Sequence, residues 1–209
     1  MNRQINQSFS GKCVLICALL VIPGVITAQP FVRDDIITDP APERFSVCFD
    51  HSCRTVTSLS LSDREWAAVI APLVVPAAGA AGERTAIAAA IAVMESVVGE
   101  HTGTSRDRGG NIRGFGQPRQ MDCIDESTNT HTYLYMLEKA GYFRHHRLVD
   151  RITRFGLFVG MPHTTAVIED LETGTRFAVD SWFYDNGQPP PVIEVSEWKS
   201  GWRPGQRRP

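Results

Sequence analysis

The spacing of apolar residues changes along this chain, and that change limits its fold more than any other feature. Between residues 83 and 98, apolar side chains recur every three or four positions, which predicts a helix. Residues 164–169 and 176–182 are instead rich in β-branched and aromatic side chains, and the turn-forming segment 170–175 joins them in a predicted hairpin. A preceding strand is predicted at 151–159. Helices followed by an antiparallel sheet predict an α+β fold, with N-terminal helices packed on the sheet.

Other segments carry signals for where helices begin and end. Ser62 and Glu65 form a capping-box pattern, which predicts a short helix that starts directly after Ser62 and ends before Pro72. A further helix is predicted over residues 123–140. Residues 101–120 contain five glycines and four arginines without helical or strand periodicity. They are predicted to form a long loop, a kind of segment that often carries function.

The first residues of the chain have the three parts of a secretory signal. Arg3 and Lys12 are basic, residues 13–22 form an apolar run, and Ala28 is a small residue for cleavage. The apolar run is shorter than the roughly 20 residues that a transmembrane helix needs, although an uncleaved anchor remains the alternative. The chain is therefore predicted to be periplasmic or secreted, with no membrane span once residues 1–28 are removed.

Composition then limits the class of protein. The 209 residues include 21 Lys and Arg and 23 Asp and Glu, for a net charge of −2, and loss of Arg3 and Lys12 with the signal gives −4. A nucleic-acid-binding protein normally has a basic excess, so no nucleic-acid partner is expected. The apolar fraction of 43% is ordinary for a globular chain. We predict an N-terminal arm with a possible disulfide loop at 29–62 and an α+β domain at 63–209.

The five cysteines can be interpreted once those in the predicted signal are separated from those in the exported chain. Two lie in the predicted signal. Cys48 and Cys53 are five residues apart, a spacing that allows a local disulfide in an oxidising compartment. His51 lies between them, so a Cys/His metal site is the weaker alternative. The pair His145–His146 is interpreted as a solvated segment rather than a metal site. Cys123 is left as the unpaired cysteine.

Cys123 is the candidate nucleophile. It is predicted to begin a helix, where free backbone N–H groups and the helix dipole lower the pKa of a thiol. His163 opens one predicted hairpin strand and Asp180 lies near the end of the other, so they are the candidate base and its orienting carboxylate. Gln117 or Gln120 is the candidate oxyanion donor, together with the Cys123 N–H. Three alternatives stay open: Cys123 as a small buried hydrophobe, His163 as a strand cap and Asp180 as a structural acceptor.

Three short motifs surround these residues: Asp122-Cys123-Ile124-Asp125, Pro162-His163-Thr164-Thr165-Ala166-Val167 and Phe177-Ala178-Val179-Asp180-Ser181-Trp182. Over about residues 83–187 the chain resembles the bacterial transglutaminase-like cysteine proteinases, a branch of the papain-like fold. The resemblance implies a transglutaminase-like core with Cys123 as nucleophile, His163 as base and Asp180 as orienting residue. It also implies acyl transfer through a thioester, with hydrolysis of a peptide, amide or isopeptide bond in a peptide or protein of the cell envelope.

The resemblance has one departure and leaves a second function open. Several transglutaminase relatives have Trp directly after the cysteine, whereas this chain has Ile124. The alternative function is a catalytically silent domain of the same fold that binds an envelope peptide or protein through the cleft beside residues 101–120. No cofactor and no metal ligand set are predicted in either case.

Overall fold

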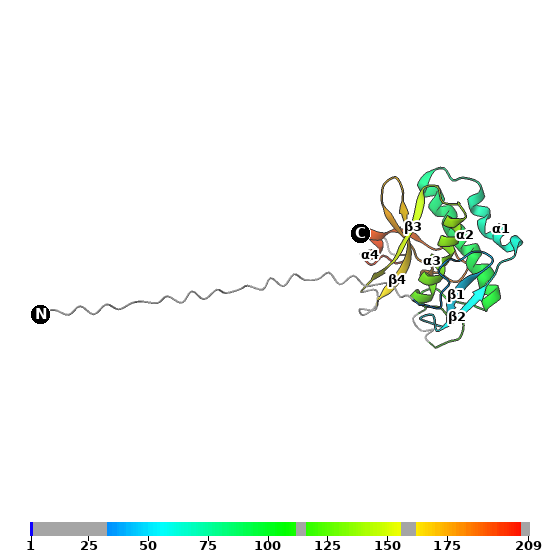
Figure 1. Cartoon of the computed structure of the whole chain (residues 1–209), viewed down its shortest axis with the longest axis horizontal. Helices are drawn as coiled ribbons and strands as arrows, with labels where there is room; N and C mark the ends of the chain where they lie inside the picture. The colour runs from blue at the N-terminus through cyan, green and yellow to red at the C-terminus, as the bar shows by residue number, and fades with distance from the viewer. Residues whose placement is uncertain (2–32, 112–115, 156–161, 206–209) are drawn as a thin grey trace.

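The computed structural model of the chain describes Met1 and residues 33–111, 116–155 and 162–205. Within these residues, four α-helices and two antiparallel sheets form an α+β fold, as predicted (Figure 1). The elements in chain order are β1 (Phe45–Phe49), β2 (Thr55–Leu59), α1 (Asp63–Val74), α2 (Gly79–Thr102), α3 (Cys123–Lys139), β3 (His146–Arg154), β4 (His163–Asp170), β5 (Arg176–Val179), β6 (Val192–Glu194) and α4 (Val195–Lys199). The predicted signal segment lies outside the described residues, apart from Met1.

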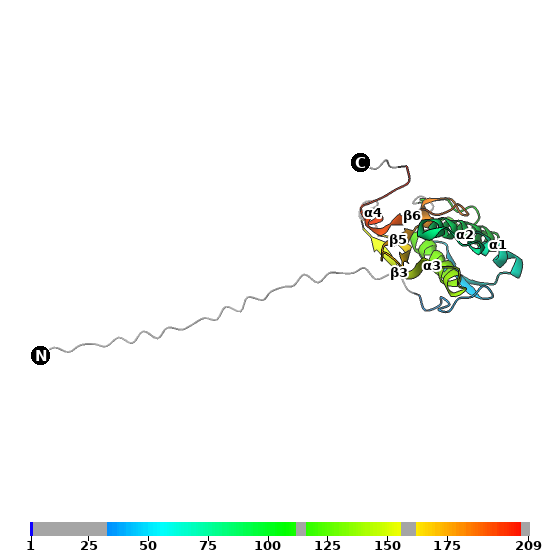
Figure 2. The ribbon, with the colours of Figure 1, turned by 90° about the horizontal axis from the view of Figure 1, so that it is seen from above.

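The larger sheet has the strand order β3-β4-β5-β6, and every neighbouring pair is antiparallel. All eight residues of β4 are buried, because α3 packs against this strand and α2 lies alongside α3 (Figures 1 and 2). The predicted hairpin is confirmed, with Ala166 opposite Val179 at its far end. β5 ends there, earlier than predicted, and Ser181–Phe183 turns into a short 3-10 helix.

Helices α1 and α2 run longer than the sequence indicated, whereas α3 ends at Lys139, one residue before its predicted end. The prediction that α1 ends before Pro72 is wrong, since the helix continues to Val74. Pro72 lies in the last turn, where it removes one backbone hydrogen bond, and the packing of Val69 and Leu73 into the core favours continuation. α2 extends past both predicted ends and stops at Gly103, which has a φ of 79°. No helix among the described residues combines the length and apolar character needed to cross a bilayer.

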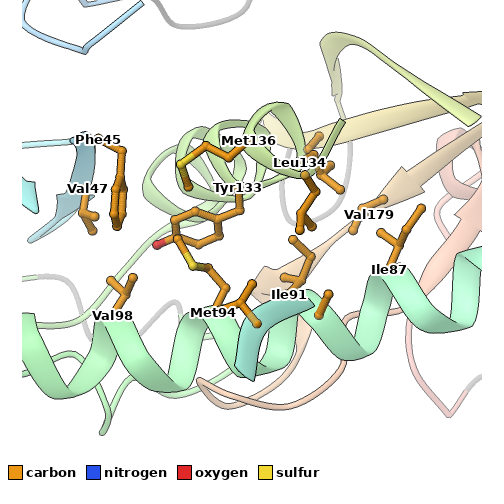
Figure 3. Close-up of a cluster of buried hydrophobic side chains, with 14 of the residues drawn as sticks. Phe45, Val47, Ile87, Ile91, Met94, Val98, Tyr133, Leu134, Met136 and Val179 are labelled. Carbon is orange, nitrogen blue, oxygen red and sulfur yellow. The ribbon is translucent and has the colours of Figure 1, made fainter. Parts of the chain in front are cut away.

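One hydrophobic core joins the N-terminal hairpin to the helices and the large sheet. Figure 3 shows side chains from β1, α2, α3 and β5 meeting in it: Phe45, Val47, Ile87, Ile91, Met94, Val98, Tyr133, Leu134, Met136 and Val179. The β1–β2 hairpin was not predicted from the sequence. Its strand β1 is buried along its whole length, so residues 45–59 pack as part of the same core as the later helices.

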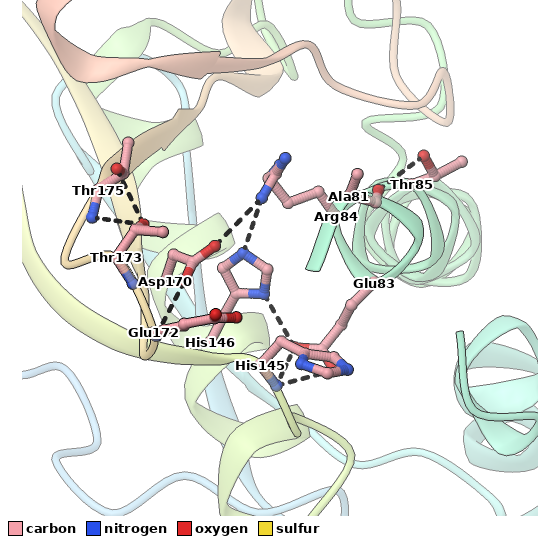
Figure 4. A network of polar contacts seen from close by, with 10 residues as sticks. All are labelled: Ala81, Glu83, Arg84, Thr85, His145, His146, Asp170, Glu172, Thr173 and Thr175. Atoms are coloured by element: carbon pink, nitrogen blue, oxygen red, sulfur yellow. Dashed lines mark hydrogen bonds and ion pairs between the residues drawn. The ribbon is translucent and has the colours of Figure 1, made fainter. Parts of the chain in front are cut away.

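A buried polar network fixes the start of β3 to the start of α2 (Figure 4). The His146 Nδ1 atom lies 2.9 Å from a Glu83 carboxylate oxygen, and Arg84 donates to His146 Nε2 at 3.2 Å. The Glu83 carboxylate also accepts from the backbone N–H of His145. The interpretation of His146 as solvated is therefore wrong, because Glu83 provides a buried partner. β3 accordingly begins five residues before residue 151, and its predicted end at 159 lies outside the described residues.

Candidate active site

Cys123 is the first residue of α3, as the sequence predicted. Asp122 caps the helix, because its side chain accepts hydrogen bonds from the backbone N–H groups of Ile124 and Asp125 at 2.9 and 3.0 Å. The Asp125 carboxylate in return accepts from the Asp122 N–H at 3.1 Å, which completes a capping box. Two carboxylates, one on each side of Cys123, thus determine where this helix starts.

The Cys123 sulfur lies against the start of β4. Its Sγ is 3.9 Å from the carbonyl oxygen of Pro162. Burial raises the pKa of the Cys123 thiol to about 12; the Thr164 backbone N–H lowers that pKa, and the charges of Asp122 and Asp180 raise it. The sequence predicted a lowered pKa from the helix start alone. The structure gives the opposite direction, because desolvation and two nearby carboxylates outweigh the helix N-terminus. Cys123 is therefore a thiol at neutral pH in the resting protein.

His163 and Asp180 form a buried pair. His163 Nε2 lies 2.7 Å from Asp180 Oδ2, and both residues are about 2% exposed. The hairpin register explains this proximity, since Asp180 follows the Ala166–Val179 pair at the same end of the sheet as His163. A carboxylate only accepts hydrogen bonds, so it assigns the Nε2 proton to His163 and leaves Nδ1 as the nitrogen that can take a proton.

Trp198 is a component of this site that the sequence analysis missed. Its indole Nε1 donates to Asp180 Oδ2 at 2.6 Å, and its ring centroid is 5.6 Å from that of His163. It comes from α4, beyond the region of family resemblance, and is fully buried. A tryptophan in a short C-terminal helix has no distinctive sequence spacing, so only the three-dimensional contact reveals its role.

Aromatic rings surround the rest of the imidazole. The ring centroids of Trp182 and Phe183 lie 4.8 and 5.5 Å from that of His163. Arg154, the β3 partner of His163 in the strand register, places its guanidinium 4.3 Å from the Trp198 ring centroid. Because these side chains exclude water, the hydrogen bond between His163 and Asp180 lies in a low-dielectric environment.

The two oxyanion candidates lie in different surroundings. Gln120 is buried, and its amide oxygen accepts from the Arg108 N–H at 3.3 Å and from Asn111 Nδ2 at 2.5 Å. Its Nε2 donates to the carbonyl of Arg106 at 3.1 Å, so both ends of the side chain hold the loop that follows α2. Gln117 is exposed on the same loop.

Buried carboxyl groups lie on another side of α3. Burial raises the pKa of Glu95 to about 7 and that of Asp107 to about 6, and it raises the pKa of Glu126 well above its usual value. Glu126 and Asp107 are hydrogen-bonded to each other. An acidic residue in the first turn of a helix usually complements the helix dipole as a carboxylate, and Glu126 occupies such a position in α3. The structure instead buries this turn between α2 and the loop, which favours the protonated carboxyl.

The predicted Cys48–Cys53 disulfide is confirmed, with a Cα–Cα distance of 4.6 Å. The two sulfur atoms also lie within 4.8 Å of an Asp125 carboxylate oxygen. A metal ion would require thiolate ligands, and the disulfide removes them. The structure thus gives no support to the Cys/His metal alternative at these residues.

A cavity of ≈ 270 Å³ lies on α3 away from these groups, between the N-terminal segment and β3. Arg33, Ile37, His131, Tyr135 and Arg151 are among its lining residues, and the three candidate catalytic residues are not. Burial lowers the pKa of His131 to about 4, so its imidazole is neutral. The candidate active site consists of the partly buried Cys123 thiol and the buried pair of His163 and Asp180, and this cavity is separate from it.

Comparison of the chain with protein-family models, curated proteins and solved structures found no match. The fold is established at the level of its class, α+β. The resemblance to the transglutaminase-like cysteine proteinases consequently rests on the three sequence motifs.

Proposed function

We propose that this chain is an exported cysteine hydrolase of transglutaminase-like fold that cleaves a peptide, amide or isopeptide bond. The observation that carries the proposal is the 2.7 Å contact between His163 and Asp180 at the strand end where the Cys123 thiol lies against Pro162. A nucleophile, a base and a group that orients the base are the three components that acyl transfer by a thiol requires. Their order, on a helix, on a strand and after the next strand, is also that of the family.

The protonation states suit activation by a base. Cys123 rests as a thiol, so its proton has to be removed as the sulfur attacks the substrate carbonyl. His163 Nδ1 accepts this proton while Asp180 holds the ring and stabilises the imidazolium. The proton then passes to the leaving amine, which leaves a thioester on Cys123. Water, deprotonated by His163, cleaves the thioester and returns the thiol.

The developing oxyanion requires a donor near the sulfur. The Cys123 backbone N–H lies in the first turn of α3, where N–H groups have no partner within the helix, and it lowers the pKa of its own thiol. This group is the oxyanion donor that we propose. Both ends of the Gln120 side chain are hydrogen-bonded within the loop, so we propose the exposed Gln117 as the second donor.

Two observations favour a second function. A Cys123 pKa near 12 and the contact of the sulfur with the Pro162 carbonyl are also what a structural cysteine would show. The second candidate is therefore a catalytically silent domain that binds an envelope peptide or protein.

Alkylation kinetics separate the two functions without a known substrate. The rate of Cys123 alkylation by iodoacetamide is measured by peptide mass spectrometry in the parent protein and in His163→Ala, and a mixed peptide library is screened for cleavage. For the hydrolase we expect His163→Ala to slow alkylation about tenfold at pH 7.5, the effect of about one pKa unit in the base-assisted thiol. Library cleavage should disappear in Cys123→Ala. Equal alkylation rates together with no cleavage would establish the silent domain.

A further inference from the structure

The loop closed by the Cys48–Cys53 disulfide has an uncommon backbone. Four consecutive residues other than glycine, Asp50, His51, Ser52 and Cys53, have φ values of 67°, 65°, 57° and 51°. L-residues disfavour this left-handed region, and single residues rather than runs normally occupy it. A run of four persists only where the surrounding structure determines it. Here the disulfide ties the last of these residues to β1.

This conformation directs successive N–H groups to the carboxylates on either side of Cys123. The His51 and Cys53 N–H groups donate to the two oxygens of Asp125 at 2.8 and 2.6 Å. The Ser52 N–H donates to Asp122 Oδ2 at 2.9 Å. Consecutive N–H groups in such an arrangement form an anion-binding concavity. Its occupants in this protein are the two side chains of the capping box that begins α3.

The loop is also attached further along the same helix. Asn129 accepts from the Cys48 N–H and donates to the Cys48 carbonyl, each at 2.8 Å. Burial raises the pKa of Asp125 to about 7, and the N–H groups of Cys53 and His51 are among the contacts that lower it. Without those contacts, Asp125 would be a buried carboxylate that has lost its charge-stabilising donors. Such a group favours reopening of the structure around it.

We propose that the Cys48–Cys53 loop positions Cys123 for its reaction with His163, and that disulfide formation switches this site on. The inference rests on the proposed function and adds its regulation. In the switching step the thiols of Cys48 and Cys53 lose two protons and two electrons to a disulfide oxidant, which becomes two thiols. In a reducing compartment the loop is open, α3 loses the support of its cap, and the hydrolase stays inactive until oxidation.

The test uses the full chain in its oxidised form, after reduction by dithiothreitol, and after re-oxidation with oxidised glutathione. Two quantities are measured: the ratio of Cys123 alkylation rates between parent and His163→Ala, and hydrogen exchange at the Ile124, Asp125 and Glu126 amides. A ratio is used because opening the site also exposes the sulfur, which changes the absolute rate. We expect the ratio to fall from about ten to about one on reduction, a change of about one pKa unit, and to recover on re-oxidation. First-turn exchange should rise about tenfold on reduction and recover with it.

Variants exclude a general loss of stability. The C48A/C53A protein should behave as the reduced parent, and D125N should lose the His163 dependence with the disulfide intact. Combining D125N with C48A/C53A should cause little further loss, because both changes break the same contacts. The matched control is V69A, which removes buried methyl groups from α1. It should lower the unfolding midpoint while its His163 ratio stays near ten.

Two results would overturn the inference. If the ratio stays near ten and first-turn exchange is unchanged on reduction, the disulfide does not control the site, although the proposed hydrolase stands. If the ratio is already one in the oxidised chain, the proposed function fails, and the switch fails with it.

Discussion

Two buried histidine–carboxylate pairs lie at opposite ends of the β3–β4 ladder, and they differ at the second nitrogen of the ring. His146 faces Asp170 in the register and His163 faces Arg154. The His146 ring is occupied on both sides, by Glu83 at Nδ1 and by Arg84 at Nε2. The His163 ring has its carboxylate on Nε2, and the thiol of Cys123 contacts the Pro162 carbonyl and the Thr164 N–H, the residues before and after His163.

A buried histidine–carboxylate pair is not by itself evidence of catalysis. Burial and a short contact are common to both sites, so neither property identifies a catalytic pair. A base needs one nitrogen that can accept a proton and a nucleophile beside it. Since Arg84 donates to the second nitrogen of His146, that pair joins α2 to β3. In the proposed mechanism, the contact of His163 Nε2 with Asp180 leaves Nδ1 to accept the proton of Cys123.

The largest expected effect comes from His163→Ala. Loss of the base should lower the hydrolysis rate of a library peptide by about 10³-fold, the usual range for a general base. Stability should change far less, which is measured by urea unfolding. The paired experiment is His146→Ala, which should leave the rate per folded molecule unchanged. If both variants lost activity equally while folded, the distinction between the two pairs would be wrong.

Glu83→Ala should produce the largest loss of stability. It removes the carboxylate that holds His146 and the backbone N–H groups of Arg144 and His145, and breaking a buried pair costs about 3 kcal/mol or more. The free energy of unfolding in urea measures this loss. Folded Glu83→Ala should retain its activity at low temperature. Retention of full stability would show that the network in Figure 4 does not fasten β3 to α2.

Trp198→Phe tests a contact to Asp180 while both members of the pair, His163 and Asp180, stay in place. An aromatic ring is kept while the indole N–H that donates to Asp180 is lost, so activity should fall about tenfold, or about 1.4 kcal/mol. Because the Asp180 carboxylate then orients the His163 ring less firmly, the loss should appear in kcat rather than in KM. A purely structural tryptophan would lower stability and leave kcat per folded molecule unchanged.

Glu95→Gln should change the free energy of unfolding least, and the pH determines whether the variant is more stable than the parent. Burial raises the pKa of Glu95 to about 7, whereas the unfolded chain has the ordinary pKa of 4.5. Between these two pH values the folded state retains a proton that the unfolded chain has released. Stability from this group is complete below pH 4.5 and is lost as pH rises through 7. The variant should therefore be about 1 kcal/mol more stable than the parent at pH 8 and no more stable at pH 4.5. Equal differences at both values would contradict a titrating Glu95.

The contribution of Glu83 to stability should depend on pH in the opposite direction. Although burial opposes it, hydrogen bonds from His146 and the backbone lower the pKa of Glu83. The stability contributed by Glu83 is present above pH 4.5 and is lost as the pH falls below that value. Urea titrations of the parent and Glu83→Ala at several pH values should converge as the pH falls below 4.5.

Local signals predicted much of this architecture. The start of a helix at Cys123 and the hairpin from β4 to β5 follow from side-chain chemistry that lies within a few residues. The β1–β2 hairpin did not follow, because its strands are stabilised by packing against α3, far away in the sequence. The same reason explains the misinterpretation of His146, whose partner is 63 residues away.

The candidate site was likewise predicted only where it depends on residues that are close in the sequence. The hairpin register brings Asp180 to His163, and that can be counted from the sequence. The raised pKa of Cys123 could not be predicted, because it depends on burial and on the charge of Asp180 across the fold. Trp198 and the disulfide loop contact the site only through tertiary structure.

The central claim is that Cys123 forms a thioester with its substrate. The most direct measurement is acid-quench mass spectrometry of the oxidised full chain mixed with the peptide library. The account predicts an acyl adduct on the peptide that contains Cys123, which is absent in Cys123→Ala and strongly reduced in His163→Ala. A folded parent protein that forms no adduct, although iodoacetamide still alkylates its Cys123, would contradict it.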